Sequence, residues 1–290
     1  MTKPKTSKGA DTRDVNLRRM YVDCRHGQLH LRSAFPSSGG FDELTTLVCL
    51  HQSPMSSRVF GSFIERMGTD RSVYAPDTPG FGESDPPAAR PSIADYAGSV
   101  CDFIDQMRLR EVDLLGYHTG AAIAAEVAIA RPQHVRRLVM VAVPAFNEAE
   151  REAFRQAPWP VPAREDGAHL LEEWQRSLRW RGPGVSLQQL AEGFAEKLRS
   201  GPHAWWGANA AMGYDAAARL PLVTQPVLVL RPNDDLWEVT PRAGALLRRA
   251  EFVDLPEYGF GLFDVASDVV AGLAREFLDR EDAAALARRA

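Results

Sequence analysis

The sequence Gly-Tyr-His-Thr-Gly at residues 116–120 constrains the fold of this chain more than any other segment. An apolar run of strand length precedes it at 111–115, and the small residues at 121–130 are typical of a helix that ends before Pro132. Glycines in such a turn allow close packing and positive φ angles. The segment therefore predicts the strand-to-helix turn of a nucleophile elbow, usually G-x-S-x-G, with His118 in place of the serine.

Four further motifs occur around this turn in an ordered series. They are an apolar strand and loop at 47–54, a strand with an Asp-x-x-Gly-x-Gly-x-Ser loop at 74–85, a strand with an acidic loop at 226–235, and a loop at 255–262. With these motifs the chain resembles the α/β-hydrolase family from about residue 21 to about residue 280. The resemblance implies a mostly parallel eight-stranded sheet flanked by helices, with an inserted helical cap.

The catalytic triad that this family normally carries is altered at two of its three positions. Asp235 stands where the resemblance places the acid. Its neighbour Asp234 competes for that role and is expected to face solvent or to form a turn. Phe260 stands in the loop that normally reads Gly-His-Gly and supplies the catalytic histidine. The chain thus retains an acid but lacks both the serine and the usual histidine.

His118 offers a different chemistry from serine. At the N-terminus of a helix, the dipole and the free N–H groups disfavour a cation, and partial burial acts in the same direction. We therefore expect a neutral imidazole that is available as a general base. We also expect a shortened dyad with Asp235, closed by one water or a rotamer change, while Phe260 fills the space of the missing histidine. The alternative is that His118 is a polar side chain that only fills space in an inactive site.

An oxyanion hole depends on backbone N–H groups, so it survives changes of side chain. The two expected donors are Thr119, which follows the elbow residue, and Gln52, which follows His51. His51 is expected beside the substrate pocket as a residue that stabilises the loop. Ser53 is not predicted to replace the nucleophile, because the sequence shows no base beside it.

The pattern along the chain predicts three parts. Residues 1–18 are expected to form a disordered tail, and residues 19–145 and 221–290 to form the core, with strands alternating with helices. Residues 146–220 interrupt that alternation with many charges and prolines, and we expect them to form the helical cap.

Five of the six tryptophans lie in the expected cap. Large aromatic residues are needed to anchor a small lid, which is their simplest role. Trp205 and Trp206 cannot both point to one side of a helix, because neighbouring side chains diverge by about 100°. One of the pair is therefore expected to face a substrate pocket together with Tyr117 and Phe260.

Composition limits the classes of partner. A formal net charge of −4 and a pI near 6.0 argue against nucleic-acid and membrane-surface partners. The three widely spaced cysteines are expected to be reduced, which suits a cytoplasmic location. The histidines show no metal-ligand spacing, so we expect no metal and no cofactor. The expected partner is a small molecule, and the sequence leaves monomer and homodimer open.

Three functions are compatible with these features. The first is an enzyme that uses His118 as a general base, or less readily as a nucleophile, on a small apolar or aromatic carbonyl compound in lyase, decarboxylase or isomerase-like chemistry. The second is an orthodox ester or epoxide hydrolase with an altered triad, but loss of a triad serine or histidine lowers the rate by a factor on the order of 10⁶. The third is a non-catalytic protein that keeps the scaffold to bind a ligand.

Overall fold

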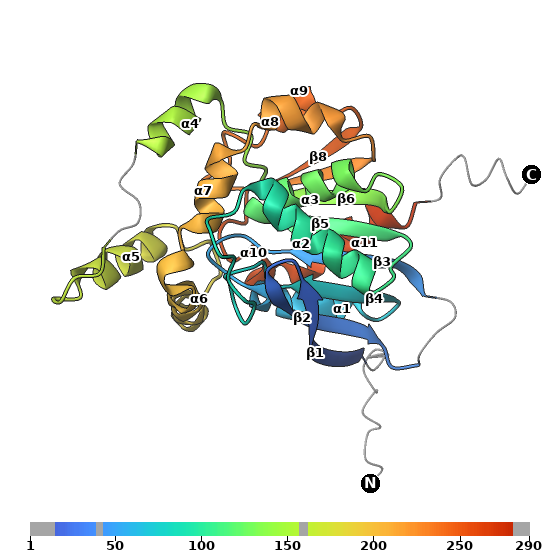
Figure 1. Cartoon of the computed structure of the whole chain (residues 1–290), viewed down its shortest axis with the longest axis horizontal. Helices are drawn as coiled ribbons and strands as arrows, with labels where there is room; N and C mark the ends of the chain where they lie inside the picture. Colours follow the sequence, from blue (N-terminus) through green and yellow to red (C-terminus); the bar gives the residue numbers. More distant parts are fainter. Residues whose placement is uncertain (1–14, 39–42, 157–161, 281–290) are drawn as a thin grey trace, which may run out of the picture.

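A single eight-stranded sheet forms the centre of the computed structural model, which describes residues 15–38, 43–156 and 162–280 (Figure 1). The strand order is β1-β2-β4-β3-β5-β6-β7-β8. The first two strands pair antiparallel with each other and β2 pairs antiparallel with β4, whereas all later pairs are parallel. The strands are β1 Val15–Cys24, β2 Gly27–Pro36, β3 Leu44–Leu50, β4 Arg71–Pro76, β5 Val112–Tyr117, β6 Val135–Val141, β7 Val227–Pro232 and β8 Ala250–Leu255. The predicted fold class is confirmed.

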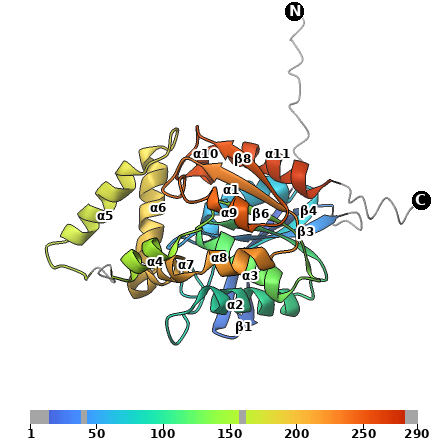
Figure 2. The ribbon, with the colours of Figure 1, turned by 90° about the horizontal axis from the view of Figure 1, so that it is seen from above.

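Helices cover both faces of this sheet (Figure 2). On one face α2 packs against α3, and on the other α1 packs against α10 and α11. The central parallel strands are therefore buried on both sides, which explains why they read as continuous apolar runs. The helices outside the long insertion are α1 Gly61–Met67, α2 Ile93–Gln106, α3 Thr119–Ala130, α9 Arg242–Leu246, α10 Leu262–Val265 and α11 Ser267–Leu278, with a short 3₁₀ turn at Ser57–Phe60.

Among the described residues, five α-helices lie between β6 and β7: α4 Glu148–Arg155, α5 Ala168–Arg179, α6 Leu187–Arg199, α7 Trp206–Gly213 and α8 Ala216–Arg219, with short 3₁₀ turns at Gly201–His203 and Leu220–Leu222. We call residues 146–156 and 162–220 the helical insertion. In both views α5 and α6 stand at one side of the sheet, with α5 outermost (Figures 1 and 2). Capping boxes at Asn147 and Ser186 begin α4 and α6, because each side chain accepts from the backbone N–H three residues later.

Two details of the expected organisation change. Strand β1 begins at Val15, so residues 15–18 are not part of a tail, and the rest of the predicted tail, 1–14, lies outside the described residues. Cys49 and Cys101 are buried and Cys24 is half-buried, all three with free thiols. None of the helices in the described ranges has the length and apolar character needed to cross a bilayer.

Candidate active site

The elbow predicted at residues 116–120 joins β5 to α3, and His118 lies at its tip. The backbone of His118 has φ 50° and ψ −115°, a strained conformation for a residue with a side chain. Its N–H donates to the carbonyl of Val141 at 2.9 Å, which ties the turn to the neighbouring strand. A Cβ atom on Gly120 would collide with the carbonyl of Leu50, and one on Gly116 would collide with Gly120. The two glycines are thus required by close backbone approach.

Asp234, and not Asp235, is the hydrogen-bond partner of His118. The Nε2 atom of His118 lies 2.8 Å from Oδ2 of Asp234, whose side chain is fully buried. The other oxygen, Oδ1, accepts from the backbone N–H of Leu236 at 2.9 Å, so the local turn fixes the carboxylate. Of the two expectations for Asp234, exposure to solvent is wrong and a place in a turn is correct, since its carbonyl accepts from the N–H of Trp237 at 3.1 Å. The dyad expected between His118 and Asp235 forms instead with Asp234, through a direct hydrogen bond.

Asp235 lies on the other side of the imidazole. Its Oδ1 is 3.9 Å from Nδ1 of His118, its side chain is 47% exposed, and it lines a cavity together with His118. Burial raises the pKa of Asp235, an effect that the charge of His118 opposes. The two ring nitrogens of His118 therefore each face one carboxylate.

The protonation of His118 follows from this pair of carboxylates. Burial, the largest single effect, favours the neutral ring, but the charge and hydrogen bond of Asp234 and the charge of Asp235 together outweigh it. The pKa of His118 is consequently raised above its ordinary value of 6.5. The expectation of a neutral ring considered only burial and the helix N-terminus, and it is wrong in direction because it omitted Asp234.

The same three residues offer ligand atoms for a metal within 4.8 Å of one another. The nearest contacts of Asp234 and Asp235 are to different nitrogens of His118. A single ion can bind only one nitrogen of an imidazole ring, so this arrangement suits hydrogen bonding by both carboxylates better than coordination of one ion.

Aromatic rings surround the remaining sides of His118. The ring centroid of Phe260 lies 5.4 Å from that of His118, and the ring of Tyr117 packs edge-on at 4.7 Å. Trp180 in turn lies 6.1 Å from Phe260. Phe260 therefore occupies space beside the elbow, where the family resemblance would place a histidine.

Gln52 and Thr119, the two expected oxyanion donors, both line the cavity. Thr119 is the first residue of α3, so its backbone N–H is among those that a helix leaves free. His51 is fully buried and does not line the cavity, so its assignment to the pocket is wrong. It holds the loop instead: Nδ1 pairs with the carbonyl of Gln52 at 2.9 Å, and Nε2 accepts from the N–H of Thr78 at 2.9 Å.

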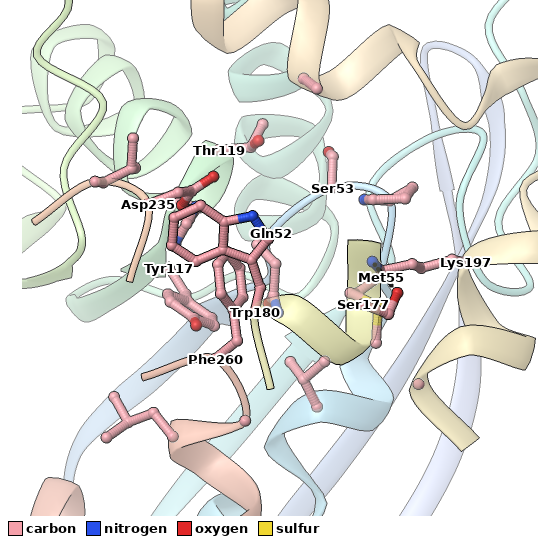
Figure 3. Close-up of a pocket in the computed structure, with 18 of the residues that line it drawn as sticks. Gln52, Ser53, Met55, Tyr117, Thr119, Ser177, Trp180, Lys197, Asp235 and Phe260 are labelled. Atoms are coloured by element: carbon pink, nitrogen blue, oxygen red, sulfur yellow. Dashed lines mark hydrogen bonds and ion pairs between the residues drawn. The ribbon is translucent and has the colours of Figure 1, made fainter. Parts of the chain in front are cut away.

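The cavity has a volume of about 310 Å³ and lies at the carboxyl ends of the parallel strands, beneath the helical insertion. Tyr117 and Phe260 line the cavity as expected. Trp180 also lines it, although the sequence analysis did not assign Trp180 to the pocket. Figure 3 shows Trp180 and Phe260 close to each other in the pocket. The apolar walls also include Met55, Phe146, Phe194, Met212 and Phe263.

Trp205 and Trp206 do not line this cavity, and their predicted pocket role is wrong. Trp205 lies under the guanidinium of Arg90, 5.4 Å from the ring centroid, and Trp206 packs against His203 at 4.4 Å. Trp205 thus joins the start of α7 to the core, the simpler role that was considered for the tryptophans of this region, whereas the contact of Trp206 lies within the insertion.

Comparison with known proteins agrees with this architecture. Residues 45–168 match the family model described as alpha/beta hydrolase fold. The enol-lactonase from Burkholderia xenovorans LB400 superposes with a TM-score of 0.74 at 15% identity, covering 90% of this chain and 100% of that one. The epoxide hydrolase CorEH superposes with a TM-score of 0.68 at 16% identity, covering 91% and 99%. The chain has the alpha/beta hydrolase fold.

Curated relatives match shorter stretches. The 1-acylglycerol-3-phosphate O-acyltransferase ABHD5 of Rattus norvegicus is 32% identical over 54% of this chain and 46% of its own length. A haloalkane dehalogenase of Mesorhizobium japonicum is 30% identical over 53% of this chain and 46% of its own. The alignments thus span less than half of these relatives. By their names, the similar proteins are mostly enzymes, with several different chemistries.

Proposed function

We propose that the protein is an enzyme of the alpha/beta hydrolase fold in which His118 transfers protons to and from a small apolar or aromatic carbonyl compound. The observation that carries the proposal is the 2.8 Å hydrogen bond between Nε2 of His118 and the buried Asp234. It leaves Nδ1, on the side of the cavity-lining Asp235, as the nitrogen that meets a ligand. Proton abstraction beside a carbonyl, cleavage of a C–C bond and decarboxylation all need such a group and no serine.

The assigned roles differ from those of an ordinary triad. There the carboxylate binds Nδ1–H and Nε2 faces the serine, whereas here Asp234 binds Nε2. Asp234 orients the ring, Nδ1 exchanges the proton, and Asp235 assists beside it. The backbone N–H groups of Gln52 and Thr119 stabilise the developing oxyanion. The helical insertion serves as the cap that excludes water, and the free, partly buried cysteines support a cytoplasmic location.

A second candidate is a non-catalytic protein that binds a ligand in the same cavity. The observation that favours it is Phe260, which fills the place of a histidine beside an elbow that lacks serine. An orthodox ester hydrolase is disfavoured, because triad losses of about 10⁶ in rate leave little turnover.

The first experiment compares the protein with its His118→Ala variant on a panel of aryl ketones and keto acids. We expect the variant to lose a factor of about 10² to 10⁴ in rate and to keep most of its ligand affinity. Because a base must be deprotonated, the rate should rise with pH and level off above a midpoint that is higher than 6.5. Ligand affinity without any turnover, unchanged by His118→Ala, would favour the non-catalytic alternative.

A second experiment restores the missing groups through His118→Ser combined with Phe260→His. We expect hydrolysis of an activated aryl ester well above that of the parent, and phosphonylation of the new serine by an organophosphonate that leaves the parent unmodified. The control is His118→Ser alone, which lacks a base and should stay slow. Rapid ester turnover by the parent, lost in His118→Ala, would instead assign His118 as a nucleophile.

A further inference from the structure

The far wall of the cavity contains an unusual residue for this chain. Lys197 is the only lysine after residue 8, and every other basic residue in that part is an arginine or a histidine. It lies on α6 and lines the same cavity as His118. Figure 3 places Lys197 and Ser177 on one side of the pocket and Asp235 and Thr119 on the other. The cavity therefore has a basic end, at Lys197, that lies opposite the acidic end at the elbow.

Charge at this basic end is not balanced by the neighbouring acid. Glu173 contacts Nζ of Lys197 at 3.0 Å through one oxygen and Nη1 of Arg176 at 3.2 Å through the other. Both cations line the cavity. One carboxylate shared between two cations leaves this group of three side chains with a formal charge of +1.

Hydrogen-bond donors are also left over at this end. An ammonium group has three donors, and Lys197 directs one to Glu173 and one to the hydroxyl of Ser177 at 3.1 Å. Ser177, which is 7% exposed, accepts that bond and so retains its own proton. The third ammonium proton and the hydroxyl proton are two neighbouring donors, which match the two oxygens of a carboxylate.

The charges at the two ends act on each other through the cavity. Burial raises the pKa of Asp235, and the positive charge of Lys197 opposes that rise. An anionic group would be repelled by Asp234 and Asp235 and attracted to Lys197, so the cavity would admit a polar molecule in one orientation.

We propose that Lys197 and Ser177 form a carboxylate-binding subsite, so that the ligand of this cavity is a molecule with a carbonyl at one end, an apolar middle and a carboxylate at the other. Apolar side chains such as Met55 and Phe194 also line the cavity and match an apolar middle. The placement of the carbonyl beside His118 rests on the proposed function, whereas the subsite itself does not.

The test is a set of binding measurements by calorimetry with three matched probes: benzoylpropionate, its primary amide, and the phosphonate of equal length. We expect the parent to bind the carboxylate about tenfold or more tighter than the amide. Lys197→Met should reduce that preference to about one, whereas Ser177→Ala should weaken it in part. Thermal melting of each variant checks that it is folded.

Glu173→Gln is the matched control, because it breaks the same ion pair but leaves the charge of Lys197. If Lys197 merely joined α5 to α6, both variants would weaken binding of all probes alike, and the proposal would be overturned. If it binds the anion, Glu173→Gln should keep or increase the preference. Equal binding of carboxylate and amide by the parent would also overturn it, and tighter binding of the phosphonate would overturn the choice of carboxylate.

His118→Ala separates this inference from the proposed function. The carboxylate preference should persist in that variant, because the altered residue lies at the other end. A carboxylate preference in a parent protein that shows no turnover of the ketone and keto-acid panel would support the subsite while contradicting the proposed enzyme. Loss of the preference in His118→Ala would place the carboxylate at the elbow and overturn the subsite.

Discussion

Two helices that flank the cavity, α3 and α6, are embedded to very different degrees. In α3, ten of twelve residues are buried, and its glycine approaches another strand so closely that a Cβ atom does not fit. In α6, one residue of thirteen is buried, Glu196, and in α5 the single buried residue is Ser177. The helix that follows the elbow is thus fixed by close packing within the core, whereas α5 and α6 are held by few buried side chains.

The two sides of the cavity, one with α3 and the other with α5 and α6, therefore suit different roles. The wall with α3 holds His118 and Asp234 in one geometry, which proton transfer requires because catalytic groups must be placed to within about 0.5 Å. The wall with α5 and α6 presents Lys197 and the aromatic side chains, whose replacement disturbs little else. We infer that the core determines the chemistry and that the insertion determines the ligand.

The largest effect is expected where the packing is tightest. Gly120→Ala introduces a Cβ atom against the backbone carbonyl of Leu50, which cannot move without displacing β3. We expect a loss of about 3 kcal/mol or more in the free energy of unfolding, or failure to fold. Urea denaturation followed by circular dichroism measures it. A loss below about 1 kcal/mol would show that the elbow is less rigid than its geometry indicates.

A smaller, pH-dependent effect is expected for the elbow histidine. The folded-state pKa of His118 is raised, so its contribution to stability is fully present below the unfolded value of 6.5 and is lost as pH rises through the folded value. The difference in free energy of unfolding between the parent and His118→Gln should therefore shrink as pH rises above 6.5 and through the raised folded-state pKa. A difference that grows over this range would mean that Asp234 does not stabilise the imidazolium.

The smallest effect, of opposite sign, is expected in the insertion. Gly193 lies inside α6, and a Cβ atom there would be 3.6 Å from Cε of Met55, an ordinary contact. Gly193→Ala should stabilise the protein by about 0.5 to 1 kcal/mol through helix propensity. Because Gly193 lines the cavity, ligand affinity should change while the rate constant of the chemical step does not. Destabilisation would contradict the loose packing inferred for α6.

The sequence allowed most of the core to be predicted, because its signals are local. Helix α11, Ser267–Leu278, is an example: its apolar residues repeat at helical spacing, which is the local signal behind the expected alternation of strands and helices. The elbow was predicted from two glycines whose need for close approach is a backbone property. Residues 15–18 alternate apolar and polar residues but follow directly on the polar start of the chain, so they were assigned to the tail; they belong to an edge strand in which half of the side chains are exposed.

The arrangement within the site was harder to predict, because it depends on tertiary contacts. Adjacent residues of a loop point in different directions, and the hydrogen bond from the N–H of Leu236 helps to hold Asp234, not Asp235, within hydrogen-bond distance of His118. The pKa of His118 was misjudged for the same reason. The position of Trp180 beside Phe260 left no signal in the sequence. Lys197 did leave a signal, because it is the only lysine after residue 8, but the sequence analysis did not predict a role for it.

The distribution of lysines has a further consequence for proteolysis. A protease that cleaves after lysine finds one target beyond residue 8, inside α6. A peptide bond within a folded helix is cut only when that helix opens, so the rate of this single cut reports local unfolding of the insertion separately from unfolding of the sheet. A ligand that bridges the cavity would protect the bond, and the degree of protection would measure how firmly the ligand holds α6 closed.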